Sequence, residues 1–334
     1  MIRWGIIGLG NMGNRFAEAA KEIKDVKINA IASLNKIKLH TFGKKFNIPS
    51  ENYFSNYDQL IESNLIDAIY IATLNNTHLD LIKKCAKFKK HILCEKPATI
   101  NENDLDDIKK IISDSNISFL EAIAFRSHPI VDELVKVLNE NKFENIISIE
   151  ANFGFNTKRI NPRSRLYNKD LGGGAILDVG CYPIAIISLV NNLIDKNNKI
   201  KFSKVEGNIC ETGVDDYGSA DLIISNGIKC YIKAAIRKQL INHVLIKTKK
   251  GKIIIKEPWL PSKKTYIEVD SNNHYYKRFV RCNFSVYANQ INFFNNMINK
   301  RLKSPTLPNL SFEDTLDIAK ISLEWRNKLL NINN

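Results

Sequence analysis

A glycine-rich turn near the amino end constrains this chain more than any other feature. The apolar run at residues 2–7 enters the turn Gly8-Leu9-Gly10-Asn11-Met12-Gly13, and a helical pattern follows at 14–22. In such a strand–turn–helix unit, the first glycine permits a tight turn, the second admits a pyrophosphate, and the third lets the helix pack close to the strand. The helix then directs free N–H groups at the phosphates. Because a second apolar run follows at 26–32, we interpret the turn as a dinucleotide site and not as an ordinary glycine-rich loop.

The end of the second predicted strand bears on which dinucleotide is bound. NAD sites usually place Asp or Glu there, where it accepts hydrogen bonds from the ribose hydroxyls. No carboxylate occurs between Asp25 and Glu51, and the positions after the strand hold Ser33, Asn35, Lys36 and Lys38. Hydroxyl and ammonium groups suit a 2′-phosphate, which a carboxylate would repel. We therefore predict NADP(H) as the preferred cofactor and NAD(H) as the alternative. The opposing interpretation makes the two lysines ordinary exposed helix residues.

Strand and helix patterns keep alternating up to about residue 124. Apolar runs predict buried strands at 67–72, 91–94 and 117–122, separated by helices that end near residues 89 and 113. This alternation predicts a parallel sheet with right-handed crossovers, whose ligands bind at the carboxyl ends of the strands. The glycine turn and two further loops meet at that edge. From those two loops we expect cofactor contacts by Thr73, Leu74, Asn75, His78, Glu95 and Lys96.

The rest of the chain has a different pattern. Its 334 residues exceed what one core usually holds, so two domains are expected. After about Arg126, strands are predicted at 146–155, 221–235, 253–255 and 266–269, with helices at 130–138, 175–191 and 312–330. Consecutive strands without intervening helices favour an antiparallel sheet. We predict an α/β protein with a parallel-sheet Rossmann domain at 1–124 and an α/β domain with a largely antiparallel open sheet at 125–334. The last helix is expected to pack back on the first domain.

Net charge and composition limit the classes of partner that this protein is expected to bind. The formal net charge is +14, but neither dense lysine cluster, at 83–90 and 247–252, lies in a helix-turn-helix or RNA-recognition pattern. We therefore expect solvated surface lysines and no nucleic-acid partner, although a phosphorylated ligand would also suit a basic protein.

The cysteine, histidine and apolar patterns indicate which cross-links, metal sites and membrane segments to expect. The six cysteines form no CxxC pair, and the six histidines are dispersed, so we expect free thiols, no disulfide scaffold and no metal. The most apolar stretch, 174–190, contains Asp178 and Pro183 and is too short to span a bilayer. These features predict a cytoplasmic protein without a membrane segment.

Four motifs together resemble a known family. They are GLGNMG at 8–13, CEKP at 94–97, EAIAFRSHP at 121–129 and GGGAILDVGCYPI at 172–184. In order and spacing they closely resemble the Gfo/Idh/MocA oxidoreductases, and most of all the branch of dimeric dihydrodiol dehydrogenase and D-xylose dehydrogenase. Deoxysugar 3-ketoreductases are near that branch. The resemblance covers essentially the whole chain. It implies a homodimer or dimer of dimers, because the open sheet of the second domain often builds the dimer interface.

The resemblance also assigns catalytic residues. Tyr182 matches the family's catalytic tyrosine, and Lys96 matches the lysine of its EKP motif, where the bond before Pro97 is often cis. Hydride transfer at a carbonyl or carbinol carbon needs a general acid/base. A free phenol has a pKa of about 10, and a neighbouring ammonium lowers it toward neutrality. Asp178, one helical turn before Tyr182, is expected to orient a substrate hydroxyl or to hold Lys96. The alternative for Asp178 is a carboxylate that stabilises the helix start.

The implied substrate is a sugar, a sugar derivative or a vicinal diol. A nucleotide-sugar ketoreductase and a non-catalytic NADP-binding regulator are the alternatives, and the presence of both Lys96 and Tyr182 argues against the regulator. Arg126 and Arg165 are candidates for substrate binding beside Asp178 and Tyr182, or else they form structural ion pairs. His78 matches a position near the cofactor, or else it is a hydrogen-bonded structural histidine. One departure from the family is Leu34, where NADP-using members often carry arginine.

Overall fold

The computed structural model of this protein describes residues 1–141, 145–224, 227–272 and 274–333. The chain folds into two units, each described here by itself. The first unit contains residues 1–127, 284–306 and 310–312, and the second contains 128–283, 307–309 and 313–334. The expected division after residue 124 lies three residues before the observed one. That expectation also placed residues 284–306 in the second domain, whereas they belong to the first unit.

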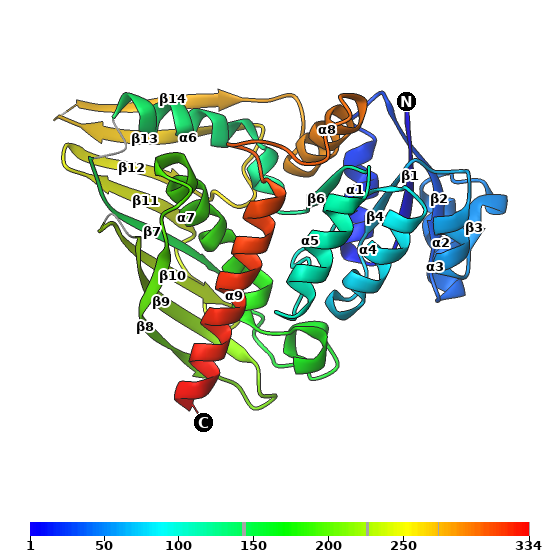
Figure 1. The fold of residues 1–334 in the computed structure, drawn as a ribbon, viewed down its shortest axis with the longest axis horizontal. Coiled ribbons are helices and arrows are strands. Elements are labelled where there is room, and N and C mark those ends of the chain that lie inside the picture. Colours follow the sequence, from blue (N-terminus) through cyan, green and yellow to red (C-terminus); the bar gives the residue numbers. More distant parts are fainter. Residues whose placement is uncertain (142–144, 225–226, 273, 334) are drawn as a thin grey trace. The chain divides into compact units, whose positions relative to one another are not determined.

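The first unit is built on a parallel sheet (sheet A) whose described strands run in the order β3-β2-β1-β4-β5-β6 (Figure 1). This order is that of a Rossmann fold, as the alternating pattern predicted. The strand at His91–Cys94 lies where the sequence places it, whereas β3 has only two residues and was not expected. The elements are β1 Ile2–Ile7, α1 Asn11–Ala20, β2 Val26–Ala32, α2 Lys36–Lys45, β3 Tyr53–Phe54, α3 Tyr57–Glu62, β4 Ala68–Ile71, α4 His78–Lys87, β5 His91–Cys94, α5 Asp104–Asp114 and β6 Phe119–Glu121.

A helix from late in the chain completes the core of the first unit. This helix, α8 (Val286–Asn299), packs against α1 and was not expected from the sequence. The buried indole N–H of Trp4 donates to Oδ1 of Asn295 at 3.1 Å, and the ring centroids of Trp4 and Phe294 lie 5.6 Å apart. Phe312, the first residue of the last helix, also belongs to the first unit, where its ring lies 5.5 Å from that of Phe119 between centroids. The last helix, α9 (Phe312–Asn333), lies in the second unit from Glu313 onward.

The second unit contains a second sheet (sheet B), with described strands in the order β14-β13-β12-β11-β7-β10-β9-β8. Its neighbouring strands are antiparallel except for the parallel pair β7 and β10, which confirms the largely antiparallel sheet. The single strand expected at 221–235 is two strands, and residues 225–226 between them lie outside the described residues. The elements are α6 Pro129–Glu140, β7 Ile146–Gly154, α7 Cys181–Ile194, β8 Ile200–Ile209, β9 Asp215–Ile224, β10 Lys229–Ala235, β11 His243–Thr248, β12 Gly251–Lys256, β13 Lys264–Ser271 and β14 His274–Arg281.

One face of sheet B is covered by helices. Helix α6 packs on β13 and β14, and α7 packs on β7 and β10 (Figure 1). Every residue of α7 from Cys181 to Asn191 is buried. The helical stretch 169–194 is apolar and long enough to cross a membrane, but its most apolar part is entirely buried inside the structure. This stretch is therefore a core helix of the second unit.

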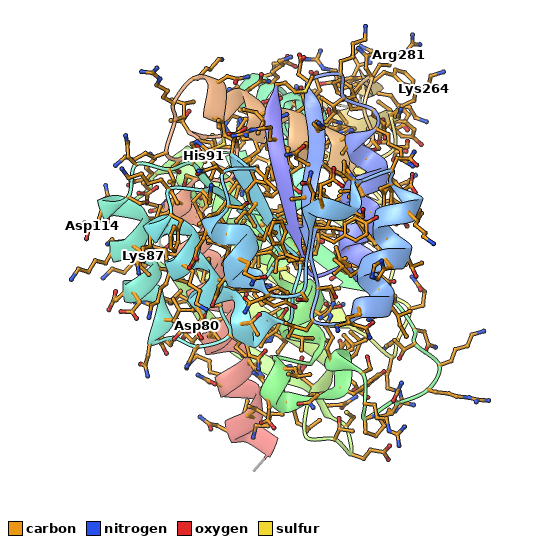
Figure 2. The ribbon with its side chains drawn as sticks, turned by 90° about the vertical axis from the view of Figure 1, so that its right-hand side faces the viewer. Asp80, Lys87, His91, Asp114, Lys264 and Arg281 are labelled. Atoms are coloured by element: carbon orange, nitrogen blue, oxygen red, sulfur yellow. The ribbon has the colours of Figure 1, made fainter. Side chains whose placement is uncertain are left out.

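The first lysine cluster is mostly a solvated surface. Lys87 and Asp80, both on α4, are exposed on the outside of the first unit (Figure 2). Lys83 and Lys84 are also exposed, and each forms an ion pair with an aspartate. Lys90 differs because it is buried and its ammonium donates to the carbonyl oxygens of residues 63 and 66. The expectation of solvated lysines therefore holds for this cluster except at Lys90.

Candidate active site

The glycine turn after β1 has the geometry of a phosphate-binding loop. Gly8 has a φ of +92°, and a Cβ there would lie 2.4 Å from the carbonyl oxygen of Ala72. A Cβ at Gly13 would lie 2.5 Å from the carbonyl oxygen of Gly8. A Cβ at Gly10 would meet nothing within 4 Å, so this side of the turn is open. Gly10 is also the N-cap of α1 and brings no capping side chain, which leaves the first N–H groups of the helix to an anion.

The end of β2 forms a small polar turn. The Ser33 hydroxyl oxygen accepts the N–H of Asn35 at 3.2 Å, and the Asn35 side chain caps α2 by accepting the N–H of Lys38 at 3.0 Å. Lys36, at the first position of α2, and Lys38 are both exposed, and the first turn of α2 has no acidic residue. The turn is therefore electropositive, with ammonium groups and a helix amino end beside a hydroxyl.

The loop after β4 supports the loop after β5. Thr73 and Thr77 share a hydroxyl–hydroxyl contact of 2.7 Å, and Leu74 is 42% exposed, whereas Asn75 is buried. His78 is fully buried, and its Nδ1 lies 2.9 Å from the carbonyl oxygen of Pro97. The Lys96–Pro97 peptide bond is cis, as the resemblance implied. His78 thus holds the turn that carries Lys96, which is the structural role among the two expected for it.

Two buried carboxylates lie beside that turn. The Tyr70 hydroxyl donates to Oε1 of Glu95, and Oε1 of Glu121 accepts the N–H of Ala98 at 2.9 Å. Burial first, and then the charge of Glu95, hold the pKa of Tyr70 well above its usual value. Lys96 itself is half-buried. Glu95, expected at the cofactor, is thus engaged with Tyr70, and the sequence pattern did not reveal Glu121.

Arg126 lies in the first unit and is 1% exposed. A guanidinium this deeply buried favours the structural alternative over substrate contact. The other candidate arginine, Arg165, lies in the second unit and is 40% exposed at its side chain. Its Nη2 forms an ion pair of 3.0 Å with Oδ1 of Asp178. Arg165 and Asp178 are therefore brought together, with the arginine still accessible to a ligand.

Asp178 and Tyr182 lie where two kinds of helix join. A continuous helix was expected over 175–191, but residues Ile176–Gly180 form a π-helical turn, which α7 follows from Cys181. A π-turn inserts one extra residue into the helical ladder and often occurs at functional sites. The Asp178 side chain is 9% exposed, and so is Tyr182. The π-turn and the start of α7 therefore carry both residues, and both side chains are largely buried.

Two aromatic residues that the sequence pattern did not reveal orient the Tyr182 ring. The Phe153 ring on β7 meets it edge-on at 5.0 Å between centroids, and the Trp259 ring meets it at 5.9 Å. The Trp259 indole N–H donates to the carbonyl oxygen of Asn152 at 2.9 Å. Edge-to-face contacts of this kind favour one ring orientation. Alternation along β7 predicts an inward Phe153, but no local signal pairs it with Tyr182.

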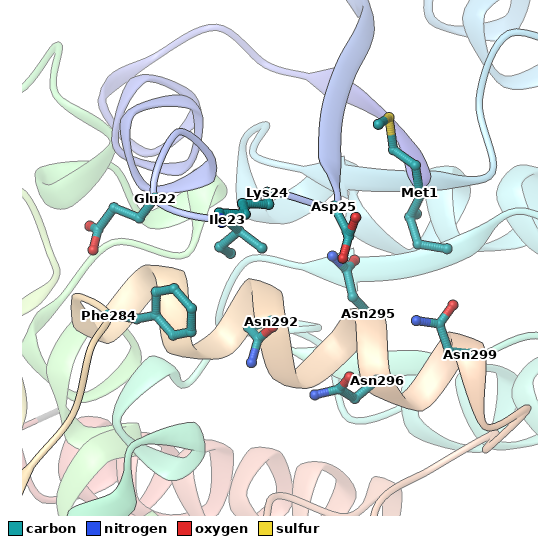
Figure 3. A pocket seen from close by; sticks show the side chains of 11 residues that line it. Met1, Glu22, Ile23, Lys24, Asp25, Phe284, Asn292, Asn295, Asn296 and Asn299 are labelled. Carbon is teal, nitrogen blue, oxygen red and sulfur yellow. The ribbon is translucent and has the colours of Figure 1, made fainter.

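The first unit also has a polar cavity away from these residues. It has a volume of about 460 Å³ and lies at the amino end of β1, the opposite edge of sheet A from the glycine turn (Figure 3). Amides of α8 line it at Asn292, Asn295, Asn296 and Asn299. Across the described residues, no group of three or more His, Cys, Asp or Glu side chains is placed to hold a metal ion.

Two family models match the chain. Residues 2–120 match the NAD-binding Rossmann fold of an oxidoreductase family, and residues 131–254 match the GFO/IDH/MocA C-terminal domain. The trans-1,2-dihydrobenzene-1,2-diol dehydrogenase of Xenopus tropicalis is 30% identical over 263 residues, which cover 78% of this chain and 77% of that protein. A D-xylose 1-dehydrogenase (NADP(+)) of Haloferax volcanii is 23% identical and covers 75% of this chain and 74% of that protein.

A solved structure has the same fold. A mutant of KijD10, a 3-ketoreductase from Actinomadura kijaniata in complex with TDP-benzene and NADP, matches with a TM-score of 0.85 at 21% identity. The match covers 98% of this chain and 97% of that chain. The motifs, the two sheets and these relatives agree, and the chain belongs to the Gfo/Idh/MocA family of oxidoreductases.

Proposed function

We propose that this protein is an NADP(H)-dependent oxidoreductase that interconverts a hydroxyl and a carbonyl group on a sugar, a sugar derivative or a vicinal diol. The observation that carries the proposal is the amino end of α1. No side chain caps this helix end, there is open space at Gly10, and the nearby turn after β2 has no acidic residue. The diol and xylose dehydrogenases among its relatives support the substrate class, and the xylose dehydrogenase is named for NADP(+).

The residues of the first unit fit such a cofactor. The N–H groups at residues 10–12 would hold the pyrophosphate, while Ser33, Asn35 and the ammonium groups of Lys36 and Lys38 would hold the 2′-phosphate. Of the loop after β4, the exposed Leu74 would contact the nicotinamide half. When bound, the nicotinamide supplies or accepts the hydride.

The protein's own part in the reaction is proton transfer and orientation. We place the Tyr182 hydroxyl at the substrate oxygen, where it donates a proton during reduction and recovers it during oxidation. The Lys96 ammonium stabilises the phenolate form of Tyr182. Asp178, held by Arg165 at 3.0 Å, accepts a hydrogen bond from a neighbouring substrate hydroxyl. The meeting of Lys96 from the first unit with Tyr182 from the second is a prediction of this proposal.

A substrate screen tests the proposed activity. The purified protein is mixed with NADPH and a panel of ketoses, aldoses and nucleotide-linked ketosugars, and then with NADP⁺ and a panel of aldoses and vicinal diols. The change in near-ultraviolet absorbance of the reduced cofactor reports turnover. We expect turnover on free sugars or diols. Turnover confined to nucleotide-linked sugars would indicate a ketoreductase, and tight NADPH binding without any turnover would indicate a regulator.

We expect the variant Ser33→Asp to turn the cofactor preference toward NAD(H). A carboxylate at this buried strand end would repel a 2′-phosphate and accept hydrogen bonds from a free ribose hydroxyl. The ratio of kcat/KM for NADPH to that for NADH should fall by about tenfold or more, a change of roughly 1.4 kcal/mol or more. Steady-state kinetics with both cofactors measures it.

The matched control for that experiment is Leu34→Arg. Leu34 is 71% exposed at the next position, so an arginine there adds a cation without disturbing the core. This variant should raise the same ratio. An unchanged ratio in Ser33→Asp would refute the argument from the end of β2.

We also propose that the protein is a homodimer formed through the uncovered face of sheet B. Strand register places Ile223 and Tyr231 on this face, and through β7, β11, β12 and β13 it places Phe279 there too. Phe279 is 70% exposed.

Light scattering should give twice the chain mass of 38.1 kDa, and the double variant Tyr231→Glu/Phe279→Glu should give the mass of a single chain. The control Ile332→Glu, at a residue near the end of α9 that is 63% exposed, should stay dimeric. A monomeric wild-type protein would contradict the proposal.

A further inference from the structure

A buried carboxylate supports the turn that carries Asp178. Asp215, the first residue of β9, is completely buried, and its Oδ2 accepts the N–H of Ile176 at 2.6 Å. Ile176 is the first residue of the π-turn. Asp215 thus caps the amino end of this helical segment from another part of the chain. A negative charge at a helix amino end satisfies free N–H groups and is favoured by the helix dipole.

The triple-glycine motif keeps room for this cap. Gly174 has a φ of +115°, and a Cβ there would lie 2.3 Å from Oδ1 of Asp215. A Cβ at Gly173 would lie 2.7 Å from the carbonyl oxygens of residues 165, 166 and 168. The Gly174 N–H also donates to the carbonyl oxygen of Leu166 at 2.9 Å. The glycines therefore join three parts of the second unit: the segment that carries Arg165, the start of the π-turn, and the Asp215 carboxylate.

Arg326 provides the counter-charge. Its Nε lies 4.0 Å from Oδ1 of Asp215, within ion-pair distance but beyond a hydrogen bond, and its side chain is 11% exposed. Its Nε and Nη2 have no hydrogen-bond partner among the described residues. A buried pair with this geometry adds little to stability, because the cost of removing both charges from water offsets their attraction. Stability alone therefore explains the pair poorly.

The pair contacts the segment that bears the proposed catalytic groups. The neighbouring Trp325 on α9 packs against the end of the π-turn, where a Cβ at Gly180 would lie 3.0 Å from its ring. Asp178 is the middle residue of the turn, and Tyr182 lies two residues after the last residue of the turn, Gly180. The Asp215–Arg326 pair and Trp325 thus hold the turn at its start and at its end.

We propose that Asp215 and Arg326 are positioning residues that fix the π-turn and thereby set Asp178 and Tyr182 for the reaction. This inference rests on the proposed function, because Asp178 and Tyr182 take their roles from it. Neither Asp215 nor Arg326 contacts substrate in the proposal.

Burial raises the pKa of Asp215 to about 6, although the N–H groups of Ile176 and Ala175 and the charge of Arg326 oppose this rise. The charged side chain that faces Asp215 is Arg326. Its sequence neighbour Asp216 is paired instead with Arg237 at 3.7 Å. The carboxylate is therefore charged at neutral pH, and it becomes protonated as the pH falls below about 6. Protonation weakens the cap at Ile176.

The test is Asp215→Asn in the full-length protein. We expect kcat to fall about 10- to 100-fold, because small displacements of reacting groups have effects of this size, while the NADPH dissociation constant stays near that of the wild type. Hydrogen exchange should become faster at the amides of 175–181 and stay unchanged in the first unit. In the reduction direction, where Tyr182 reacts as the protonated phenol, the wild-type kcat should decline below about pH 6, and this decline should be absent in the variant.

The matched control is Asp216→Asn, which removes the adjacent carboxylate. It should leave both kcat and exchange at 175–181 as in the wild type. If Asp215→Asn does not fold, Arg326→Gln provides the test. Loss of the cation should raise the pKa of Asp215 further and move the acidic decline of kcat to higher pH.

Two results would overturn the proposal. One is a wild-type kcat and pH profile in Asp215→Asn or Arg326→Gln. The other is faster exchange throughout the second unit, with no local effect at 175–181, which would indicate a purely structural pair. The proposed function is tested separately by Tyr182→Phe. If that variant keeps its activity while exchange at 175–181 responds to Asp215→Asn, the roles of the catalytic groups fail and the fixing of the turn stands.

Discussion

Tyr182→Phe should lower kcat by about 100- to 10,000-fold, the range expected when a positioned general acid/base is lost. The substitution removes only the hydroxyl. The ring contacts with Phe153 and Trp259, at 5.0 and 5.9 Å, involve ring atoms that phenylalanine retains. The π-turn and α7 should therefore keep their structure, and the loss of rate should come from proton transfer alone.

The measurement combines steady-state turnover with two checks. Turnover is followed with the substrate that the screen identifies, in both directions. NADPH binding, by fluorescence titration, and the melting temperature should match the wild type. Tyr57→Phe, a tyrosine of α3 in the first unit, is the matched control and should keep full activity. A Tyr182→Phe variant with kcat within about twofold of the wild type would remove Tyr182 as the acid/base.

Local sequence patterns predicted the first unit well, because each of its site motifs is a contiguous run of residues. The strand at His91–Cys94 is a short run, buried from its second residue onward, that ends at the EKP motif, and its position was predicted to the residue. The glycine turn was predicted because the spacing of its glycines is a recognisable pattern, and two of them meet a close backbone approach. Gly8 meets the strand end at Ala72, and Gly13 meets Gly8 itself. Such contacts leave a spacing that can be recognised in the sequence.

The second unit was predicted less well, because its site depends on distant contacts. The hydrogen bond from the N–H of Ile176 to Asp215 joins residues 39 positions apart, and no sequence pattern in either segment predicts it. The π-turn was not predicted for the same reason. Its residues have the sequence pattern of an ordinary helix, and the contact of Gly180 with Trp325 of α9 joins distant parts of the chain. Helix α8 was not predicted, and the hydrogen bond that ties it to the first unit joins Trp4 and Asn295, which are 291 positions apart.

Lys96→Met should give the second large effect, on both the rate and its pH dependence. The variant keeps a long apolar side chain on the cis turn supported by His78, but it removes the ammonium. Without that positive charge the phenolate of Tyr182 is less favoured, so the pKa of the phenol rises. In the oxidation direction the phenolate must accept a proton, so kcat should fall and its acidic limb should move to higher pH, by about 1 to 3 units.

The pH profile separates this role from simple binding. Oxidation rates of the wild type and Lys96→Met are compared across pH at saturating NADP⁺ and substrate, so that kcat is measured without KM. Lys87→Met, which removes an exposed lysine of α4, should leave the profile in place. A higher KM with an unshifted kcat profile would make Lys96 a binding residue. Because Lys96 lies in one unit and Tyr182 in the other, a shifted profile would also be functional evidence that the two groups meet over the substrate.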